Sequence, residues 1–185
     1  MKCKHCKTKF EVKFFNQKFC ILNDDCRSAA TQYAIEQKEK NFKANRAKDT
    51  KERKEALTTH SEWLKILQVV FNTYIRERDK KEGFGCISCG TTKFGIQYAA
   101  GHYFTVGGFP SVRFDEDNLH LQCNNFCNMQ LSGNIINYRP ALIERIGLER
   151  FEALEYRARN GVLKLSIPEI KEKIIYYKAK IKELK

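Results

Sequence analysis

Eight cysteines divide into two groups of four, and each group has the spacing of a zinc ligand set. Each group opens with a Cys-x-x-Cys pair, and a second pair follows further along the chain. The groups are Cys3, Cys6, Cys20, Cys26 and Cys86, Cys89, Cys123, Cys127. Four thiolates suit tetrahedral Zn²⁺, so the sequence predicts two structural zinc sites. Redox-active or simply buried thiols are the alternative interpretation.

Residues suited to hydrolysing a phosphodiester lie within and just after the second cysteine group. His102 could act as general base, because a neutral imidazole near pH 7 can take a proton from an attacking water. Asn118 could hold the His102 ring or the nearby backbone in place. Asn128 directly follows a cysteine and could offer its carbonyl oxygen to Mg²⁺ or Mn²⁺.

Three further residues are weighed against structural roles. His120 is two residues from Asn118, so on a strand both side chains would point to one face. It is predicted to bind a metal or a phosphate, with packing as the alternative. A purely structural role is equally open for Asn118. His5 lies inside the first cysteine group but is not needed there, because four cysteines suffice.

Four segments are expected to position these residues. Residues 1–26 read as a zinc knuckle or ribbon, which is too small to bury a core without its metal. Residues 27–57 are rich in charge and lack Gly and Pro, which predicts a solvated helical arm or linker. Residues 58–147 would form the core that carries the site, and residues 148–185 the C-terminal helices.

Local signals place the elements inside these segments. Thr59 and Glu62 have capping-box spacing ahead of an apolar helical pattern. Segments 96–104 and 111–114 flank a Gly-Gly-Phe-Pro turn and read as a hairpin. Helices are expected from Pro140 to Gly147, over 148–159, and from Ser166 to the end of the chain.

The C-terminal helix carries an apolar stripe with heptad spacing. Its members are Ile167, Ile170, Ile174, Tyr177, Ile181 and Leu184. The stripe predicts a homodimer seam. Packing on the helix of residues 63–75 is the alternative.

The charge of the chain favours a polyanionic partner. The 185 residues carry a formal net charge of +12, which fits DNA, although ribosomal or membrane-surface binding would fit it as well. The residues predicted to contact DNA are Arg76, Arg78, Arg139, Lys38, Lys43 and Arg46. The sequence holds no apolar run of membrane-spanning or signal-peptide length, so a cytoplasmic chain is expected.

The ordered motifs resemble the NinG (Rap) recombination proteins of lambdoid phages. The resemblance runs from the N-terminal cysteines through Tyr-Ile-Arg-Glu-Arg-Asp at 74–79 and Gly-His-Tyr at 101–103. It continues through Ser-Gly-Asn at 132–134 and Tyr138-Arg139 to Arg-Ile-Gly at 145–147. It implies an α+β fold: a zinc-stapled ββα-metal (HNH-like) nuclease core with flanking helices and an N-terminal zinc knuckle. It also implies a metal-dependent endonuclease of branched recombination intermediates such as Holliday junctions.

The chain departs from this pattern at two points. Many HNH enzymes place Asp before the catalytic His, whereas this chain has Gly101, so Glu116 is predicted to complete the catalytic metal site. The last cysteine pair is Cys-x-x-x-Cys, one residue longer than usual. The alternatives kept open are a general nicking or homing-type nuclease, a non-catalytic zinc-dependent DNA-binding module, and a protein-interaction adaptor.

Overall fold

The computed structural model describes residues 1–184; Lys185, the last residue of the predicted C-terminal segment, lies outside the described residues. The chain divides into two compact units, one ending at Thr58 and the other beginning at Thr59. It has a mostly helical α+β architecture with a single two-stranded hairpin among the described residues. None of the helices described is both long and apolar enough to cross a membrane.

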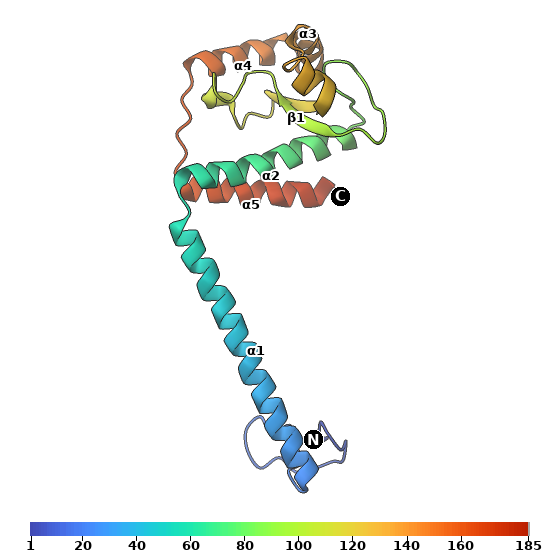
Figure 1. Cartoon of the computed structure of the whole chain (residues 1–185), viewed down its shortest axis with the longest axis vertical. Helices are drawn as coiled ribbons and strands as arrows, with labels where there is room; N and C mark the ends of the chain where they lie inside the picture. Colours follow the sequence, from blue (N-terminus) through green and yellow to red (C-terminus); the bar gives the residue numbers. More distant parts are fainter. Residues whose placement is uncertain (185) are drawn as a thin grey trace. The chain divides into compact units, whose positions relative to one another are not determined.

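The first unit consists of the cysteine-rich segment and the long helix α1, Asp24–Leu57 (Figure 1). The Asn23 side chain caps this helix by accepting a 2.8 Å hydrogen bond from the Cys26 backbone N–H. Asp24 and Asp25 in the first turn suit the positive end of the helix dipole. Among the residues of α1, all of them described, Cys26 alone is buried. The predicted helix is present, and solvent surrounds most of it.

In the second unit, helices α2 (His60–Lys81) and α5 (Ile167–Leu184) lie side by side (Figure 1). The predicted capping box at Thr59 is confirmed, because Thr59 and Glu62 exchange both hydrogen bonds. Ile170, Ile174 and Tyr177 are buried in one cluster with α2 residues that include Phe71. The C-terminal stripe therefore packs on α2, the alternative interpretation, and its buried members cannot also pair with a second chain.

Replacing Ile174 with alanine should lower the free energy of unfolding of the second unit by about 2–5 kcal/mol, because it leaves a cavity in this cluster. Denaturant unfolding followed by Trp63 fluorescence measures the loss, since Trp63 lies in the same cluster. The matched control is Ile175→Ala, because Ile175 is 71% exposed. That change should stay within about 0.5 kcal/mol. Equal effects would contradict this packing.

The hairpin pairs β1 (Tyr98–His102) with β2 (Leu119–Cys123) in antiparallel register. The prediction that segment 111–114 forms the second strand was wrong. That segment lies in a loop that opens with a 3₁₀ turn, Pro110–Val112. Two features hold it there: Val112 is buried in a cluster with Tyr138, and Asn118 binds its backbone carbonyl.

Helices α3 (Ile135–Ile146) and α4 (Leu148–Asn160) complete the second unit. The predicted start of α3 at Pro140 was wrong, because the helix begins at Ile135 and Pro140 lies inside it. Tyr138, Leu142 and Ile146 recur every fourth residue and are all buried. Burial of this face outweighs the one backbone hydrogen bond that a proline removes.

The hairpin has a core on each face. Ala100 and Leu119 belong to the cluster of α2 and α5. On the other face, the Tyr138 hydroxyl donates a 2.9 Å hydrogen bond to the Gly101 carbonyl. Both strands are therefore held from two sides, which fixes the direction of the side chains at their ends.

Candidate functional site

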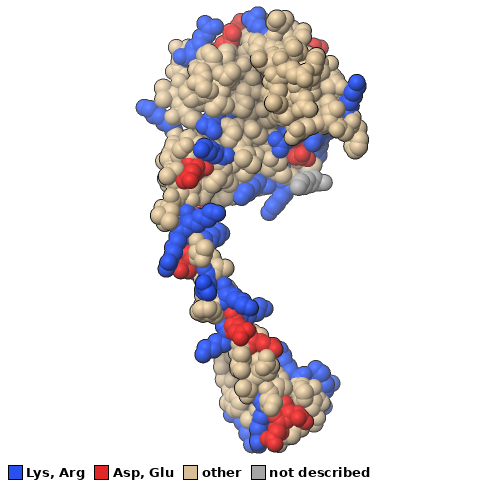
Figure 2. Space-filling model, viewed as in Figure 1, with Lys and Arg blue, Asp and Glu red and all other residues tan. Residues whose placement is uncertain are grey.

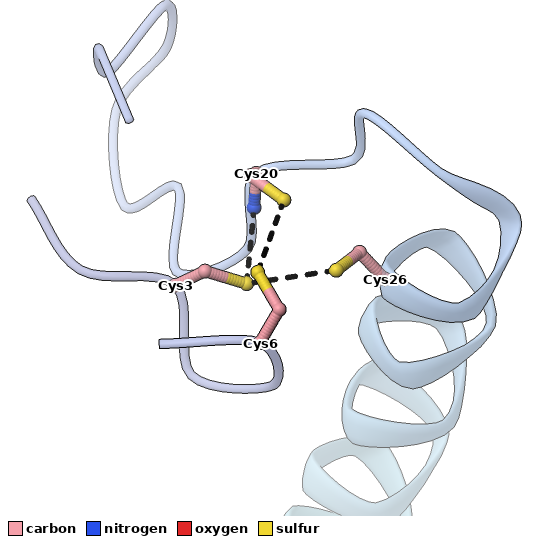
Figure 3. Close-up of side chains that lie close together, drawn as sticks. All are labelled: Cys3, Cys6, Cys20 and Cys26. Carbon is pink, nitrogen blue, oxygen red and sulfur yellow. Dashed lines mark hydrogen bonds between the residues drawn. The ribbon is translucent and has the colours of Figure 1, made fainter. Parts of the chain in front are cut away.

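The first cysteine group comes together at the start of α1 (Figure 3). Cys26 reaches it from the first turns of the helix, and Cys3, Cys6 and Cys20 from the preceding loops. The sulfur–sulfur distances are 3.9 Å for Cys3–Cys26 and 3.7 Å for Cys6–Cys20. Zn–S bonds of about 2.3 Å in a tetrahedron place sulfurs about 3.8 Å apart. The group therefore fits a structural zinc site.

The second cysteine group fits one as well, with Cys89 and Cys123 sulfurs 3.8 Å apart. The extra residue of its last pair is accommodated by a π-helical turn, Asn124–Gln130, in which the Leu131 N–H binds the Phe126 carbonyl five residues back. The Cys127 N–H points at the Cys123 sulfur at 3.4 Å, which stabilises a thiolate. This zinc site would tie the end of β2 to the Cys86–Cys89 turn.

His102 ends β1 and is half-buried. Its Nε2 atom is buried and has no hydrogen-bond partner within residues 1–184. The pKa of His102 is lowered to about 4, chiefly because burial disfavours the charged ring. A backbone hydrogen bond with Arg113 opposes this shift, and the positive charge of Arg113 adds to it. His102 is therefore a neutral imidazole whose buried Nε2 makes no hydrogen bond to the described residues.

Asn118 fastens the loop that follows His102. Its Nδ2 donates to the carbonyls of Phe104 and Val112, both at 3.0 Å, and its Oδ1 accepts from the Phe104 N–H at 2.7 Å. Its backbone carbonyl also accepts from the Tyr103 N–H. These contacts are all to backbone, so Asn118 positions the chain next to His102, and its contacts are those of the structural interpretation.

His120 lies on the other face of the hairpin from His102. Cross-strand pairing sets His102 opposite Leu119 and His120 opposite Gly101, and side chains alternate faces along a strand. His120 is buried, and burial lowers its pKa although Asp79 favours the charged ring. The structure therefore does not bring the two predicted histidines into one site.

His120 belongs instead to a buried ionic network centred on Asp79. The Asp79 carboxylate lies 2.7 Å from Arg78, 3.3 Å from Arg145 and 3.7 Å from His120. It also accepts a 2.6 Å hydrogen bond from the Leu121 N–H on β2. Burial opposes ionisation of Asp79, but the neighbouring His120 ring and the Arg78 charge outweigh it, so the pKa of Asp79 is lowered. The network joins α2, β2 and α3.

Replacing Asp79 with asparagine should cost about 3–5 kcal/mol of the free energy of unfolding, because Arg78 and Arg145 lose the anion that compensates their burial. Urea unfolding of the zinc-loaded protein, followed by Trp63 fluorescence, measures the change. The matched control is Glu77→Gln, which removes a more exposed acid on the same helix that pairs with Lys80. A loss below about 1 kcal/mol for Asp79→Asn would show that the network is not what anchors α2 to the hairpin.

The acidic run before Asn118 is already engaged. Glu116, the predicted metal ligand, accepts from the Tyr74 hydroxyl at 3.0 Å and pairs with Arg78 at 3.6 Å. Asp115 pairs with Arg157, and Asp117 with Arg150 and Arg157.

The residues expected to hold a catalytic metal make other contacts in the structure. Asn128 lies in the π-helical turn and donates to Asn124. Among residues 1–184, no hydrogen bond or ion pair joins His102 to Glu116 or Asn128, and the two cysteine groups are the only clusters of three or more His, Cys, Asp or Glu donors. A catalytic metal held by Glu116 and Asn128 stays a prediction.

Position 101 has no room for the missing aspartate. A Cβ at Gly101 would collide with the Gln122 side chain, whose Cδ would be 2.9 Å away. Gln122 is fixed because its Nε2 donates to Ser88 Oγ at 2.7 Å and to the Gly133 carbonyl at 2.6 Å. A side chain at position 101 would also point to the same face of the hairpin as His120, which is the face opposite to that of His102.

The basic residues predicted to contact DNA have different surroundings. Lys38, Lys43 and Arg46 are exposed on α1, along which Lys and Arg are spread (Figure 2). Arg139 is exposed and lies over the Phe151 ring, and Arg76 is half-buried. The Arg78 side chain is only 14% exposed and binds Asp79. The Arg78 charge is therefore paired within the protein.

Two residues that matter here were missed from the sequence. Arg113 lies close enough to lower the pKa of His102 and donates to Gln68 at 2.7 Å. No sequence signal separated it from other basic residues. The sequence did indicate that Asp79 is buried, because Asp79 continues the four-residue spacing of the buried Leu67, Phe71 and Ile75. The charges around it suggested a solvated helix end instead.

Comparison with known proteins places the whole chain in one family. The family model described as "Bacteriophage Lambda NinG protein" matches residues 1–185. The chain is 38% identical to protein ninG of Escherichia phage 933W and 36% identical to protein ninG of Escherichia phage lambda, each over 100% of this chain and 93% of the relative. It is 39% identical to protein ninG of Salmonella phage P22 over 83% of this chain and 79% of the relative. No solved structure matches it. The chain belongs to the NinG protein family of lambdoid phages.

Proposed function

We propose that this protein is an endonuclease that hydrolyses phosphodiesters in branched DNA, with His102 as general base and an HNH-like core around it. One observation carries the proposal: the buried His102 Nε2 has no partner in the part of the chain described. An unsatisfied buried polar atom is costly, and a catalytic role is one explanation for keeping one. The resemblance to recombination proteins of lambdoid phages supplies the class of substrate.

Because its pKa is lowered, the His102 ring is neutral at pH 7 and can accept a proton. The His102 Nε2 would take a proton from a water molecule as its oxygen attacks phosphorus. The bond from phosphorus to the leaving deoxyribose oxygen then breaks, and that oxygen gains a proton from solvent. Arg113, whose positive charge acts on His102, would offset the charge that builds on the phosphoryl oxygens. Asn118 would keep the backbone after His102 fixed during this step.

A catalytic Mg²⁺ or Mn²⁺ belongs to the proposal through the resemblance alone. The expected ligands, Glu116 and Asn128, have hydrogen-bond partners other than His102 among the described residues. We therefore derive no step through a metal, and the dependence of cleavage on added Mg²⁺ or Mn²⁺ has to be measured.

Substrate contact would be mostly electrostatic. Phosphates are the same at every sequence, which suits an enzyme that reads branch shape. The exposed Lys38, Lys43, Arg46 and Arg139 are our candidates for these contacts. Paired cuts in a four-way junction would need two active sites. We propose a homodimer in the cytoplasm of the host cell, formed by a surface other than the buried α5 stripe.

The experiment that tests this function is cleavage of a synthetic four-way junction. Purified zinc-loaded protein is incubated with the junction, a linear duplex of the same arms and a supercoiled plasmid, with Mg²⁺ or Mn²⁺. Preferential junction nicking supports the proposal. Equal cutting of all three would favour a general nicking nuclease. Junction binding without cutting would favour a zinc-dependent binding module, and neither activity would favour an interaction adaptor.

The rate of cleavage should be nearly independent of pH across the range in which a histidine of ordinary pKa becomes protonated. Because the pKa of His102 is about 4, its ring stays neutral as the pH falls through the usual histidine range. The single-turnover rate should therefore change less than about twofold between about pH 7.5 and about pH 6, where a base with pKa ~6.5 would lose about three quarters of its neutral form. Quenched-flow rates at saturating protein measure this. A fall in the rate centred near the ordinary histidine pKa of about 6.5 would contradict this prediction.

A further inference from the structure

A turn in the first unit presents two phenylalanine rings to solvent. Phe14 is 55% exposed and Phe15 is 91% exposed, and both lie in the loop between Cys6 and Cys20. The buried Gln17 holds this loop, because its Oε1 accepts from the Lys13 N–H at 2.8 Å and its Nε2 donates to the Phe19 carbonyl at 3.0 Å. The rings therefore stand on a fixed turn, which we call the aromatic turn (residues 13–18).

The aromatic turn borders a hollow in the first unit. The hollow has a volume of about 340 Å³ and is lined by residues that include Phe14, Phe19 and Tyr33. The rings of Phe19 and Tyr33 lie 5.5 Å apart between centroids. Base–aromatic stacking needs exposed ring faces, which Phe14 and Phe15 offer, and every base has a face of its own.

Positive charge surrounds the same surface. Residues 1–22 contain six lysines (Lys2, Lys4, Lys7, Lys9, Lys13 and Lys18) and one acid, Glu11. The ammonium groups of Lys4 and Lys18 lie 4.6 Å and 5.1 Å from the centroid of the Tyr33 ring. Lys18 also donates to the Tyr33 hydroxyl at 3.0 Å, which with Lys4 lowers the pKa of Tyr33. Flat rings among cations match a strand that offers both bases and phosphates.

We propose that the aromatic turn binds unpaired DNA nucleotides, with bases stacked on Phe14 and Phe15 and phosphates on the neighbouring lysines. Bases in a duplex are stacked on one another, so this surface would prefer strands opened at a branch point. The inference shares the DNA substrate with the proposed function but does not need the cleavage chemistry at His102.

Binding without cleavage tests the proposal. Fluorescence anisotropy with labelled oligothymidylate and a labelled hairpin duplex, in buffer without added divalent metal, compares full-length variants of confirmed zinc content. Phe14→Ala and Phe15→Ala should each weaken oligothymidylate binding roughly 5- to 150-fold, the loss of one stacked base. Duplex affinity should stay within about twofold, since phosphate contacts remain. The control Leu22→Ala removes an exposed side chain of the same unit that has no ring, and should change neither.

A second variant reports on stacking directly. Phe15→Trp should keep the affinity and add an emission that oligothymidylate quenches, whereas Trp63, the only native tryptophan, is buried in the other unit. Unchanged affinity in both alanine variants, equal loss for duplex, or no quenching would overturn the proposal. So would alanine variants that lose binding to phosphatidylserine vesicles but not to oligothymidylate. Nicking is measured in a separate assay. Base stacking without cleavage would therefore contradict the proposed endonuclease function but not the binding of unpaired nucleotides.

Discussion

Replacing His102 with alanine should lower the rate of junction cleavage ~10²–10⁴-fold, the usual loss for a general base. Junction affinity should stay within about twofold, because binding rests on phosphate contacts elsewhere. No second imidazole can take over, since His120 is buried on the opposite face of the hairpin and lies against Asp79. Single-turnover cleavage and electrophoretic mobility shift of the same junction measure the two effects.

The matched control for His102 is His60. His60 is an exposed histidine whose Nε2 lies 2.6 Å from the Leu165 carbonyl, and it has no part in the proposed site. His60→Ala should cut at close to the wild-type rate. Cleavage by His102→Ala at that same rate would remove His102 as the base. A variant that no longer binds the junction would point instead to a fold defect, which Trp63 fluorescence would detect.

Loss of zinc should unfold the two units separately. Structural zinc contributes about 10–16 kcal/mol of apparent binding free energy in finger peptides, far more than one side-chain contact. The wild type should hold two zinc ions per chain, and Cys3→Ser and Cys123→Ser should each hold one. Cys123→Ser should abolish cleavage and expose Trp63, because Cys123 ends the strand that pairs with β1. Cys3→Ser should leave Trp63 fluorescence and the cleavage step unchanged, since Cys3 lies in the other unit.

Each serine variant is the control for the other. Metal analysis gives the zinc ratio, and limited proteolysis shows which unit has opened. One zinc in the wild type with alkylation at Cys3 and Cys6 would refute the first site. A Cys3→Ser variant that also exposes Trp63 would show that the units do not fold independently.

Patterns that repeat over short distances were predictable from the sequence. Both cysteine groups, the Thr59 capping box and the helices α1, α2, α4 and α5 follow from local spacing and composition, and the structure contains all of them. The zinc sites were readable because four thiolates of suitable spacing have few alternatives. The starts of α2 and α5 were readable because their caps, Thr59 and Ser166, are local.

What failed depended on contacts distant in the sequence. The second strand was misplaced because Val112 looked like a strand residue, and only burial against Tyr138 and the Asn118 hydrogen bonds fold its segment as a loop. Pro140 was predicted to start a helix, but buried residues on both sides of it stabilise α3, which continues across the proline. His120 was grouped with Asn118 by strand alternation, whereas the register sets it away from His102. Asp79 draws three partners from distant segments, which no local pattern reveals.

The collision between Gly101 and Gln122 has a consequence for how this site can evolve. Two of the four glycine codons are one base away from an aspartate codon, so mutation can offer the residue that many HNH enzymes carry before the catalytic histidine. The fixed Gln122 side chain makes that change unfavourable alone. Shortening Gln122 first would give up its hydrogen bonds to Ser88 and Gly133 before any gain. Each step is harmful without the other, so a lineage with this pair stays at glycine unless both positions change nearly together.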